Sequence, residues 1–397
     1  MRVTATTQLQ LFWRDSFVHK DFRSGVSLHS HTMYSEESLG MVPRYTAGVP
    51  YLGDAIRRQQ AEYSRNKGRD FDFGRAFWTP PLAARQAYRL EEKQIQRRLQ
   101  LPGLISITDH DDIRAGLLLR VLDRFRHAPV STEWTIPFGT TFFHLGVHNL
   151  PAGEANGIME VLEQFTANPE EAKLEGVLEM LNSYPDVLLV LNHPLWDEKG
   201  IGIQNHEQVL TRLLKNYGRH FHALELNGLR SWQENKGVLV LGRETGLPLV
   251  SGGDRHGREP NAILNLSRGA TLVEFVHEVR YRGFSHVVFM PQYHEPLKLR
   301  ILQTMVDIVR EYPESLEGRR TWAERVFYRD PSTNNAIPLA AIWGDGGPAV
   351  VRHFIMAMRL LELRSVRSVL RLALDDRSKV WQGAGFPALE ADREAAV

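Results

Sequence analysis

The stretch SLHSHTMYSEE, residues 27–37, continues a short apolar run directly into two histidines, His29 and His31. A short run of this kind, nearly all apolar, suits a strand that is buried on both faces of a parallel sheet. Side chains alternate along a strand, so His29 and His31 point to the same side and are placed to bind one ion. The pair alone is weak evidence for a metal site, but its position at a strand end strengthens that interpretation.

Four further clusters of histidine and carboxylate residues occupy the same kind of place along the chain. They are Asp109-His110-Asp111, Glu133 together with His144, His193, and Asp254-Arg255-His256. Helical stretches lie between most of the apolar runs, which favours an α/β fold with a parallel sheet, most simply a barrel. Because such a barrel gathers its C-terminal strand ends at one mouth, the clusters would converge there. The sequence therefore predicts a pocket that holds several divalent metals.

Two of these clusters have features that a structural role leaves unexplained. A helix N-cap by Asp111 or Asp112 accounts for one aspartate of its cluster but not for His110. Glu133 lies in an otherwise uncharged stretch, and a buried lone carboxylate is costly unless it is paired or bound to metal. A carboxylate can also bridge two cations, which a neutral imidazole cannot do. Glu133 is therefore the candidate for a shared ligand.

Composition excludes several other kinds of chemistry. The chain has 397 residues, a formal net charge of +1 and no cysteine. It therefore has no disulfide, no thiolate nucleophile and no cysteine-type zinc site, and no overall field drives it onto nucleic acid or an anionic membrane. Its beginning lacks the pattern of a signal peptide, and no apolar run is long enough to span a bilayer. We expect a cytoplasmic protein without a membrane partner.

The alternation of strands and helices predicts three parts. Residues 24–292 form the barrel, and residues 41–100 interrupt it as a helical insertion whose second half, 81–99, is one helix. An insertion at the mouth of a barrel usually becomes a lid or a pocket wall. Residues 296–397 form a C-terminal helical extension, with helices expected at 297–312 and 349–374 and a disordered polar tail. The second helix carries a stripe of Arg364, Arg367 and Arg371 and would pack on the barrel or on a partner subunit.

Six motifs in this order resemble the PHP (polymerase and histidinol phosphatase) family over residues 24–292. They are SLHSHTMYSEE (27–37), ISITDHDD (105–112), STEW with FFHLGV (131–134 and 142–147), LNHP (191–194), LELN (224–227) and SGGDRHG (251–257). The resemblance implies a distorted seven-stranded β/α barrel of the PHP type that holds two or three divalent metal ions. Zinc, manganese and iron all suit a set of histidine and carboxylate ligands.

Carried over position by position, the resemblance implies nine metal ligands: His29, His31, Glu36, His110, Glu133, His144, His193, Asp254 and His256. The first metal would take His29, His31, Glu133 and Asp254. The second would share Glu133 and add His144 and His193, and the third would take Glu36, His110 and His256. Glu36 departs from the family, which usually has aspartate or histidine at this position, and its extra methylene puts the third metal in doubt.

Such a centre suits hydrolysis of a phosphate ester by metal-bound hydroxide, without a covalent phospho-enzyme. Asp109, Glu133 and Asp254 are the catalytic candidates, and Asp109 would orient a ligand or a water. Arg230, Arg255 and Arg258 are candidates for binding the phosphate oxygens, because arginine offers a planar fork of donors. Pairing of these arginines with nearby carboxylates is an equal alternative.

The expected substrate is a small phosphorylated metabolite or a nucleotide. A basic insertion with interleaved aromatic residues leaves open an exonuclease-like phosphodiesterase acting on nucleic acid. A catalytically silent PHP binding module is a further alternative, which the loss of ligands would mark. An amidohydrolase-type enzyme also begins with His-x-His, but it would usually need a lysine at a central strand end. Assembly into a homo-oligomer is left open.

Overall fold

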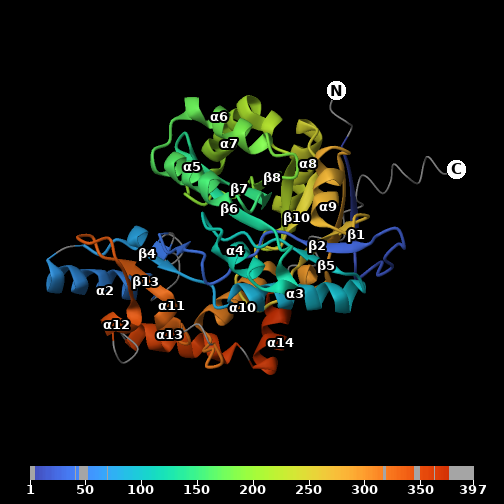
Figure 1. Ribbon diagram of the computed structural model, residues 1–397. Helices are drawn as coiled ribbons and strands as arrows, with labels where there is room; N and C mark the ends of the chain where they lie inside the picture. The colour runs from blue at the N-terminus through green and yellow to red at the C-terminus, as the bar shows by residue number, and fades with distance from the viewer. Residues whose placement is uncertain are drawn as a thin grey trace.

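A computed structural model describes residues 5–40, 42–43, 52–68, 70–315, 319–343, 349–361 and 363–374. The chain is mixed α/β, and the strands within these ranges pair in three sheets (Figure 1). The histidines and carboxylates of the sequence motifs lie where two of the sheets meet. Apolar side chains fill the spaces between the sheets and the helices that cover them.

The first sheet has the strand order β1-β12-β11-β2-β5. Its strands are β1 (Thr6–Leu11), β2 (Ser24–Ser27), β5 (Gly103–Ile105), β11 (Ile263–Ser267) and β12 (Phe284–Phe289). β1 pairs parallel with β12 and β2 pairs parallel with β5, whereas β11 is antiparallel to both of its neighbours. β1 lies before residue 24 and was not predicted. Its polar and apolar residues alternate, whereas the predicted strands are runs of nearly all apolar residues.

The second sheet has the order β10-β9-β8-β7-β6. Its strands are β6 (Val130–Phe138), β7 (Thr141–Leu150), β8 (Leu188–Asn192), β9 (Ala223–Asn227) and β10 (Leu249–Gly252). β8, β9 and β10 are parallel, but β7 is antiparallel to β6 and β8. The tight turn between β6 and β7 reverses the chain at Gly139, where φ is +58° and glycine carries no penalty.

Short bridges join the two sheets at the strand ends that carry the histidine motifs. Ser30 pairs with Arg255 beyond β2 and β10, and His110 pairs with Glu133 where the segment after β5 meets β6. The backbone N–H of His31 donates to the Arg255 carbonyl at 2.9 Å. Pairing in the described ranges thus gives two open sheets linked at their ends, so the closed seven-stranded barrel stays a prediction.

Helices cover the outer faces of these sheets. They are α3 (Ala84–Leu99), α4 (Arg114–Arg120), α5 (Ala155–Ala167), α6 (Glu171–Asn182), α7 (Ile203–Tyr217), α8 (Trp232–Thr245) and α9 (Leu272–Arg280). In α5, Ile158, Leu162 and Phe165 recur at helical spacing and are buried, with Phe165 edge-on to Trp134 of β6. Each fully buried side chain of this kind contributes roughly 1.5–3 kcal/mol. The predicted helix at 81–99 begins at Ala84.

A third sheet joins the insertion to the C-terminal region. Its order is β14-β13-β4-β3, with β3 (Glu37–Ser38), β4 (Ala76–Trp78), β13 (Val326–Arg329) and β14 (Ala336–Pro338). All its pairings are antiparallel, and Phe77 stacks on Phe327 across β4 and β13. The description of these two regions as helical was therefore incomplete. The strands are short and their partners lie far away in the sequence, so no local pattern marked them.

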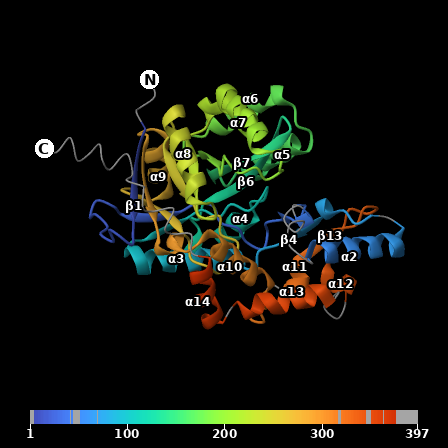
Figure 2. The same ribbon diagram turned by 180° about the vertical axis from the view of Figure 1, so that it is seen from behind.

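The remaining helices lie in the lower half of the view from behind (Figure 2). They are α2 (Leu52–Lys67), α10 (Leu297–Val309), α11 (Trp322–Arg325), α12 (Leu339–Trp343), α13 (Ala349–Leu360) and α14 (Arg364–Ala373). The single helix predicted at 349–374 is thus two helices, and Arg371 pairs with Glu295. None of the described helices is long and apolar enough to cross a membrane. The tail predicted to be disordered, from residue 375 on, lies outside the described residues.

Candidate metal centre

Glu133 lies at the centre of the site, on β6, with its carboxylate fully buried. Its Oε2 atom lies 3.0 Å from His29 Nε2, 3.4 Å from His31 Nε2 and 3.3 Å from His110 Nδ1. Its Oε1 atom lies 3.1 Å from His193 Nε2 and 3.5 Å from His144 Nδ1. One carboxylate therefore faces two separate sets of ring nitrogens.

The pair from the first motif lies on the Oε2 side of Glu133. The Nε2 atoms of His29 and His31 are 3.1 Å apart. Asp254 Oδ1 lies 3.8 Å from the first and 3.6 Å from the second. Four possible ligand atoms, from the segment after β2, from β6 and from the segment after β10, thus crowd around one small space.

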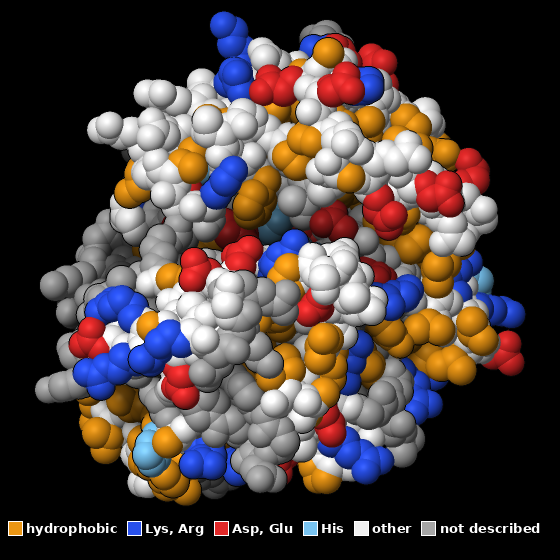
Figure 3. Space-filling view, turned by 90° about the vertical axis from the view of Figure 1, so that its left-hand side faces the viewer, with side chains coloured by type: hydrophobic (Ala, Val, Ile, Leu, Met, Phe, Trp, Pro, Cys, Tyr) orange, Lys and Arg blue, Asp and Glu red, His pale blue; other side chains and the backbone are white. Residues whose placement is uncertain are grey.

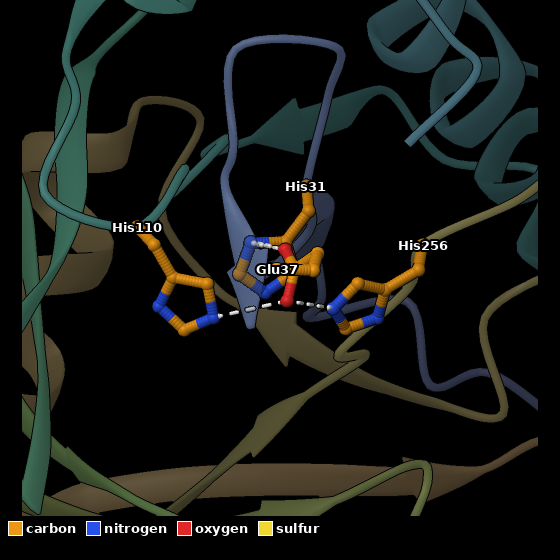
Figure 4. A group of neighbouring side chains, drawn as sticks. All are labelled: His31, Glu37, His110 and His256. Carbon is orange, nitrogen blue, oxygen red and sulfur yellow. Dashed lines mark ion pairs between the residues drawn. The ribbon is translucent and has the colours of Figure 1, made fainter. Parts of the chain in front are cut away.

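A second carboxylate, that of Glu37, lies among the rings of His31, His110 and His256 (Figure 4). Its Oε2 atom is 3.3 Å from His110 Nε2 and 3.2 Å from His256 Nε2, and its Oε1 atom is 3.6 Å from His31 Nδ1. The rings of His110 and His256 both stack against His31, with centroids 4.7 and 4.3 Å apart. This group shares His31 and His110 with the residues around Glu133 and adds Glu37 and His256.

The structure does not bring Glu36, the predicted ligand, into this group, because its side chain points away from it. Its side chain is 44% exposed and pairs with Arg329 of β13. Glu36 and Glu37 are adjacent, and β3 begins at Glu37, so successive side chains point to opposite sides. The buried carboxylate is therefore that of Glu37, and the register of β3 against β4 selects it.

Burial and close charge shift the pKa of these groups in opposite directions. Burial alone raises the pKa of Glu133, but the ring charges of His29, His110 and His144 outweigh it and hold the pKa well below its usual range. Burial, reinforced by His256, lowers the pKa of His31 to about 4, and burial likewise lowers that of His144. Burial also lowers the pKa of His29, His110 and His256, but the nearby carboxylates outweigh it: they raise the pKa of His29 and His110 well above its usual range and that of His256 to about 9. Metals bind ionised carboxylates and neutral imidazoles, so a cation bound here would displace protons from these three rings.

A further shell of polar side chains, which the sequence analysis missed, holds these groups in place. His29 Nδ1 lies 2.5 Å from Glu225 Oε1, and Glu225 Oε2 accepts hydrogen bonds from the His193 backbone N–H and from Asn227 Nδ2. Asn192 Nδ2 donates to Glu133 Oε1 at 2.9 Å. Partners of this kind fix ring orientation and tautomer. The sequence does mark these residues, because they are polar side chains at the ends of the otherwise apolar strands β8 and β9.

The backbone at three site residues adopts the left-handed region. The φ angles are 59° at His29, 27° at His193 and 50° at Asp254. Non-glycine residues in this region cost on the order of 1–3 kcal/mol each, and such strain gathers at functional sites. The strain turns the three side chains inward at the points where their strands end.

Asp109 lies one step away from the ring nitrogens. Its two carboxylate oxygens accept hydrogen bonds from the Thr32 backbone N–H at 2.5 Å and from the Thr32 hydroxyl at 2.7 Å. Burial raises its pKa to about 7. Asp109 therefore fixes the chain that follows His31 and does not line the cluster itself.

Of the three arginines proposed to bind phosphate, only Arg230 reaches the centre. Its NH2 atom lies 3.7 Å from Asp254 Oδ2, and its guanidinium lies 4.1 Å from the ring centroid of Trp196. Arg255 is buried and bonded to Glu91, so the structure places it away from the space where phosphate would bind. Arg258 lies 3.6 Å from Glu314 and against the Tyr312 ring, which removes it from the site as well.

A hollow leads to the cluster between the two halves of the molecule, with a histidine side chain on its floor (Figure 3). Phe142, His144, His193, Trp196 and Glu198 line a small pocket at this place. Glu198 Oε2 lies 3.8 Å from His144 Nδ1, and the sequence analysis did not single it out. The pocket therefore combines a hydrophobic wall with charged groups close to the cluster.

The aromatic residues of the insertion pack against one another. The Phe71 ring stacks on Tyr328 and meets Tyr63 and Phe73 edge to face. Trp78 of β4 lies 5.7 Å from the ring of His256, measured between centroids. Most of these rings thus contribute to a small local core, and Trp78 extends that core to the edge of the histidine cluster.

The donor set fits divalent metal ions. Among the described residues, three groups have ligand atoms that all lie within 4.8 Å of one another: His29, His31 and Glu133; His110, Glu133 and His144; and His31, Glu37, His110 and His256. Imidazole nitrogens and carboxylate oxygens in such proximity are the ligands that zinc, manganese and iron take. Cations between them would relieve the crowding of lone pairs that their distances show.

Comparisons with known proteins leave the family open. No family model matches the chain, and no curated protein matches it. Among solved structures it is similar to PsfC from Pseudomonas syringae PB-5123, with 15% identity, a TM-score of 0.37, and coverage of 56% of this chain and 88% of that one.

A second solved structure is a protein from Bifidobacterium adolescentis ATCC 15703, provisionally named a metal-dependent phosphoesterase. Its identity is 14% and its TM-score 0.31, with coverage of 50% of this chain and 91% of that one. At these TM-scores neither likeness carries an argument about the fold or the chemistry of this chain. The geometry of the site has to carry that argument.

Proposed function

We propose that this chain is a metal-dependent phosphoesterase that hydrolyses the phosphate ester of a small metabolite or a nucleotide. The observation that carries this proposal is Glu133, a fully buried carboxylate whose two oxygens face different sets of histidines. That arrangement suits a carboxylate shared by two cations. We also propose that strands from the two linked sheets form the seven-stranded barrel to which the sequence motifs point.

Each group of side chains would hold one cation. His29, His31 and Asp254 would do so with Glu133 Oε2, and His144 and His193 with Glu133 Oε1. Glu37, His110 and His256 would hold the third. Divalent cations bound there would supply Lewis acidity and would lower the pKa of a bound water. Glu225, which is bonded to His29 and to the His193 backbone, would keep both histidines in position.

Arg230 would bind the phosphate group of the substrate. Its guanidinium is held between the Trp196 ring and Asp254, so its donors are oriented before substrate arrives. Planar guanidinium groups suit phosphate oxygens, and an oriented fork loses less entropy on binding than a free one. Phe142 and Trp196 in the wall of the pocket would limit the access of water to the reacting group.

The alternatives that the sequence left open gain less support. Stacking of single-stranded bases needs free aromatic faces, but Tyr63, Phe71 and Phe73 of the insertion pack on one another and on Tyr328. A silent binding module would have lost ligands, whereas Glu37 supplies the carboxylate that Glu36 does not. The small-molecule phosphoesterase is therefore the proposal that we test.

The test is hydrolysis of a panel of phosphomonoesters and nucleotides by the metal-free protein after addition of Mn²⁺ or Zn²⁺. We expect phosphate release that depends on the metal and that Glu133→Gln abolishes. Glu278→Gln is the matched control, because Glu278 is also buried but accepts a hydrogen bond from Ser267, away from the site. Equal activity in wild type and Glu133→Gln would contradict the proposal.

A further inference from the structure

A buried ion pair joins the insertion to the segment that carries two of the site residues. Arg255 Nε donates to Glu91 Oε1 at 2.8 Å and NH2 donates to the same oxygen at 2.6 Å. Both side chains are about 1% exposed. Glu91 lies on α3, inside the insertion, and 164 residues separate the partners. Arg255 lies between Asp254 and His256, whose side chains reach the cluster.

The polar atoms of this pair make further hydrogen bonds, to the same segment and to β2. The second oxygen of Glu91 accepts a hydrogen bond from the Ser27 hydroxyl at 2.6 Å. The remaining nitrogen of Arg255, NH1, donates to the Gly257 carbonyl. Asn261 Nδ2 also donates to Ser27 Oγ, at 2.7 Å. The pair therefore ties α3, the end of β2 and residues 255–261 into one hydrogen-bonded unit.

Packing of the helix sets the position of Glu91. Ala87 and Ile95, four residues to either side on the same face of α3, are completely buried. Ile95 approaches β2 so closely that a Cβ on Gly25 would lie 2.6 Å from its Cγ2 atom. Glu91 is thus fixed by the core on both sides and has little freedom to follow a displaced Arg255.

The segment that Arg255 anchors is also strained and tightly paired. Asp254 has a φ of 50°, and its backbone N–H donates to the His29 carbonyl at 2.8 Å. The Arg255 carbonyl accepts from the His31 backbone N–H at 2.9 Å. Because Arg255 points away from the cluster while Asp254 and His256 point toward it, a shift of the Arg255 side chain would move both.

We propose that Glu91 is a positioning residue for the metal centre, acting through Arg255 on Asp254 and His256. This inference rests on the proposed function, because it assumes that these residues bind metal. It gives the insertion a part in the chemistry: α3 supplies a buried carboxylate that holds the segment in its binding geometry. It also explains why an arginine between two ligands is unavailable to phosphate.

The test compares metal binding by wild type, Glu91→Gln and Arg255→Lys with that by Glu278→Gln. The affinity for Mn²⁺ is measured by calorimetry on metal-free protein, and the visible absorption of added Co²⁺ reports ligand geometry. Unfolding of each protein in the presence of a chelator gives its stability without metal. Glu278→Gln removes a buried carboxylate that contacts Ser267 instead of an arginine, so it controls for the substitution itself.

We expect Glu91→Gln to weaken Mn²⁺ binding roughly 10-fold, the lower end of the loss for removing a direct partner of a metal ligand, because Glu91 acts through Arg255. The Co²⁺ spectrum should change, and Glu278→Gln should keep the wild-type affinity and spectrum. Arg255→Lys keeps the charge but loses the two-bond fork, so it should fold and show a smaller loss in the same direction. If Glu91→Gln does not fold, Arg255→Lys still decides the question.

Reduced stability in the chelator with wild-type metal affinity and Co²⁺ spectrum in both variants would overturn the inference, since the pair would then be merely structural. A wild-type protein that binds no metal would overturn the proposed function first, and the inference with it. The two failures are distinguishable because the first leaves metal-dependent hydrolysis intact.

Discussion

Glu36 and Glu37 are neighbours in the chain, but they belong to two regions that handle charge in opposite ways. Glu37 lies in the metal centre, where buried carboxylates face histidine rings and strained backbone holds them. Glu36 lies on the outer side of the sheet β14-β13-β4-β3, where an exposed carboxylate pairs with Arg329. The difference teaches that burial and neighbouring rings, and not residue type, decide which glutamate is a candidate ligand.

The energetic consequences of the two pairings also differ. Exposed ion pairs such as Glu36–Arg329 are screened by water and typically contribute less than about 1 kcal/mol. Buried groups that lose a partner keep the full cost of desolvation. Changes in the metal centre should therefore have large effects that depend on metal, whereas changes in the outer sheet should affect only the free energy of unfolding.

Metal-linked stability gives the largest expected difference between the regions. At free metal near a thousandfold above the dissociation constant, binding should raise the free energy of unfolding by about 4 kcal/mol. Phe77→Leu, which weakens the stacking on Phe327 in the outer sheet, should lower stability but keep this increment. Glu133→Gln should abolish it. Denaturant unfolding with and without metal checks both, and a lost increment in Phe77→Leu would break the comparison.

Substitution of the adjacent residues Glu36 and Glu37 tests the comparison within one short segment of the chain. Glu37→Gln removes a carboxylate that faces His110 and His256 directly. The affinity of this variant for metal should therefore fall by more than roughly 100-fold, the upper value for losing a residue that only bonds a metal ligand. Glu36→Gln should leave metal affinity and activity unchanged. Calorimetric titration of both variants with Mn²⁺ measures this, and a stronger effect at Glu36 would show that the register of β3 is different.

Arg230 and Arg258 extend the comparison to the substrate. A charged hydrogen bond is worth about 1.5–3 kcal/mol, so Arg230→Met should raise the KM for a phosphate ester roughly 10- to 100-fold. Arg258→Met should change it little, because Arg258 is engaged with Glu314 and the Tyr312 ring. Steady-state kinetics on the best substrate of the panel decides, and an equal rise in both variants would contradict the placement.

His222, a partly buried histidine outside the cluster, gives the smallest expected effect. His222 Nδ1 accepts from the Leu189 N–H and its Nε2 lies 2.8 Å from Asn182 Oδ1. Burial, reinforced by Arg280, lowers its pKa to about 3. Since the unfolded chain takes up the proton near pH 6.5 and the folded chain does not, stability falls as pH drops below 6.5 toward 3.

From pH 7 to pH 5 this loss should be about 2 kcal/mol, by proton linkage. His222→Asn removes the titrating group, so the stability of the variant should fall by about that much less over the same interval. Urea unfolding of the metal-free proteins at the two pH values checks this. An identical pH dependence in both would show that His222 is protonated in the folded state.

Local patterns in the sequence were sufficient to find most histidines of the centre, because these histidines follow short apolar runs that form strands. His193, for example, comes directly after β8, which ends at Asn192. Local patterns were insufficient wherever a partner far away in the sequence determines the position of a side chain. Glu36 and Glu37 are distinguished only by the pairing of β3 with β4, and Arg255 by Glu91 on a helix 164 residues away. The outer sheet was missed for the same reason, since its strands are short and paired across the whole chain.

Anomalous diffraction from crystals of the protein grown with Mn²⁺ or Zn²⁺ tests the central claim most directly. The account predicts metal peaks within coordination distance of both oxygens of Glu133, one toward His29 and His31 and the other toward His144 and His193. A map with no anomalous peak beside the Glu133 carboxylate, from protein that is active in the same solution, would contradict it.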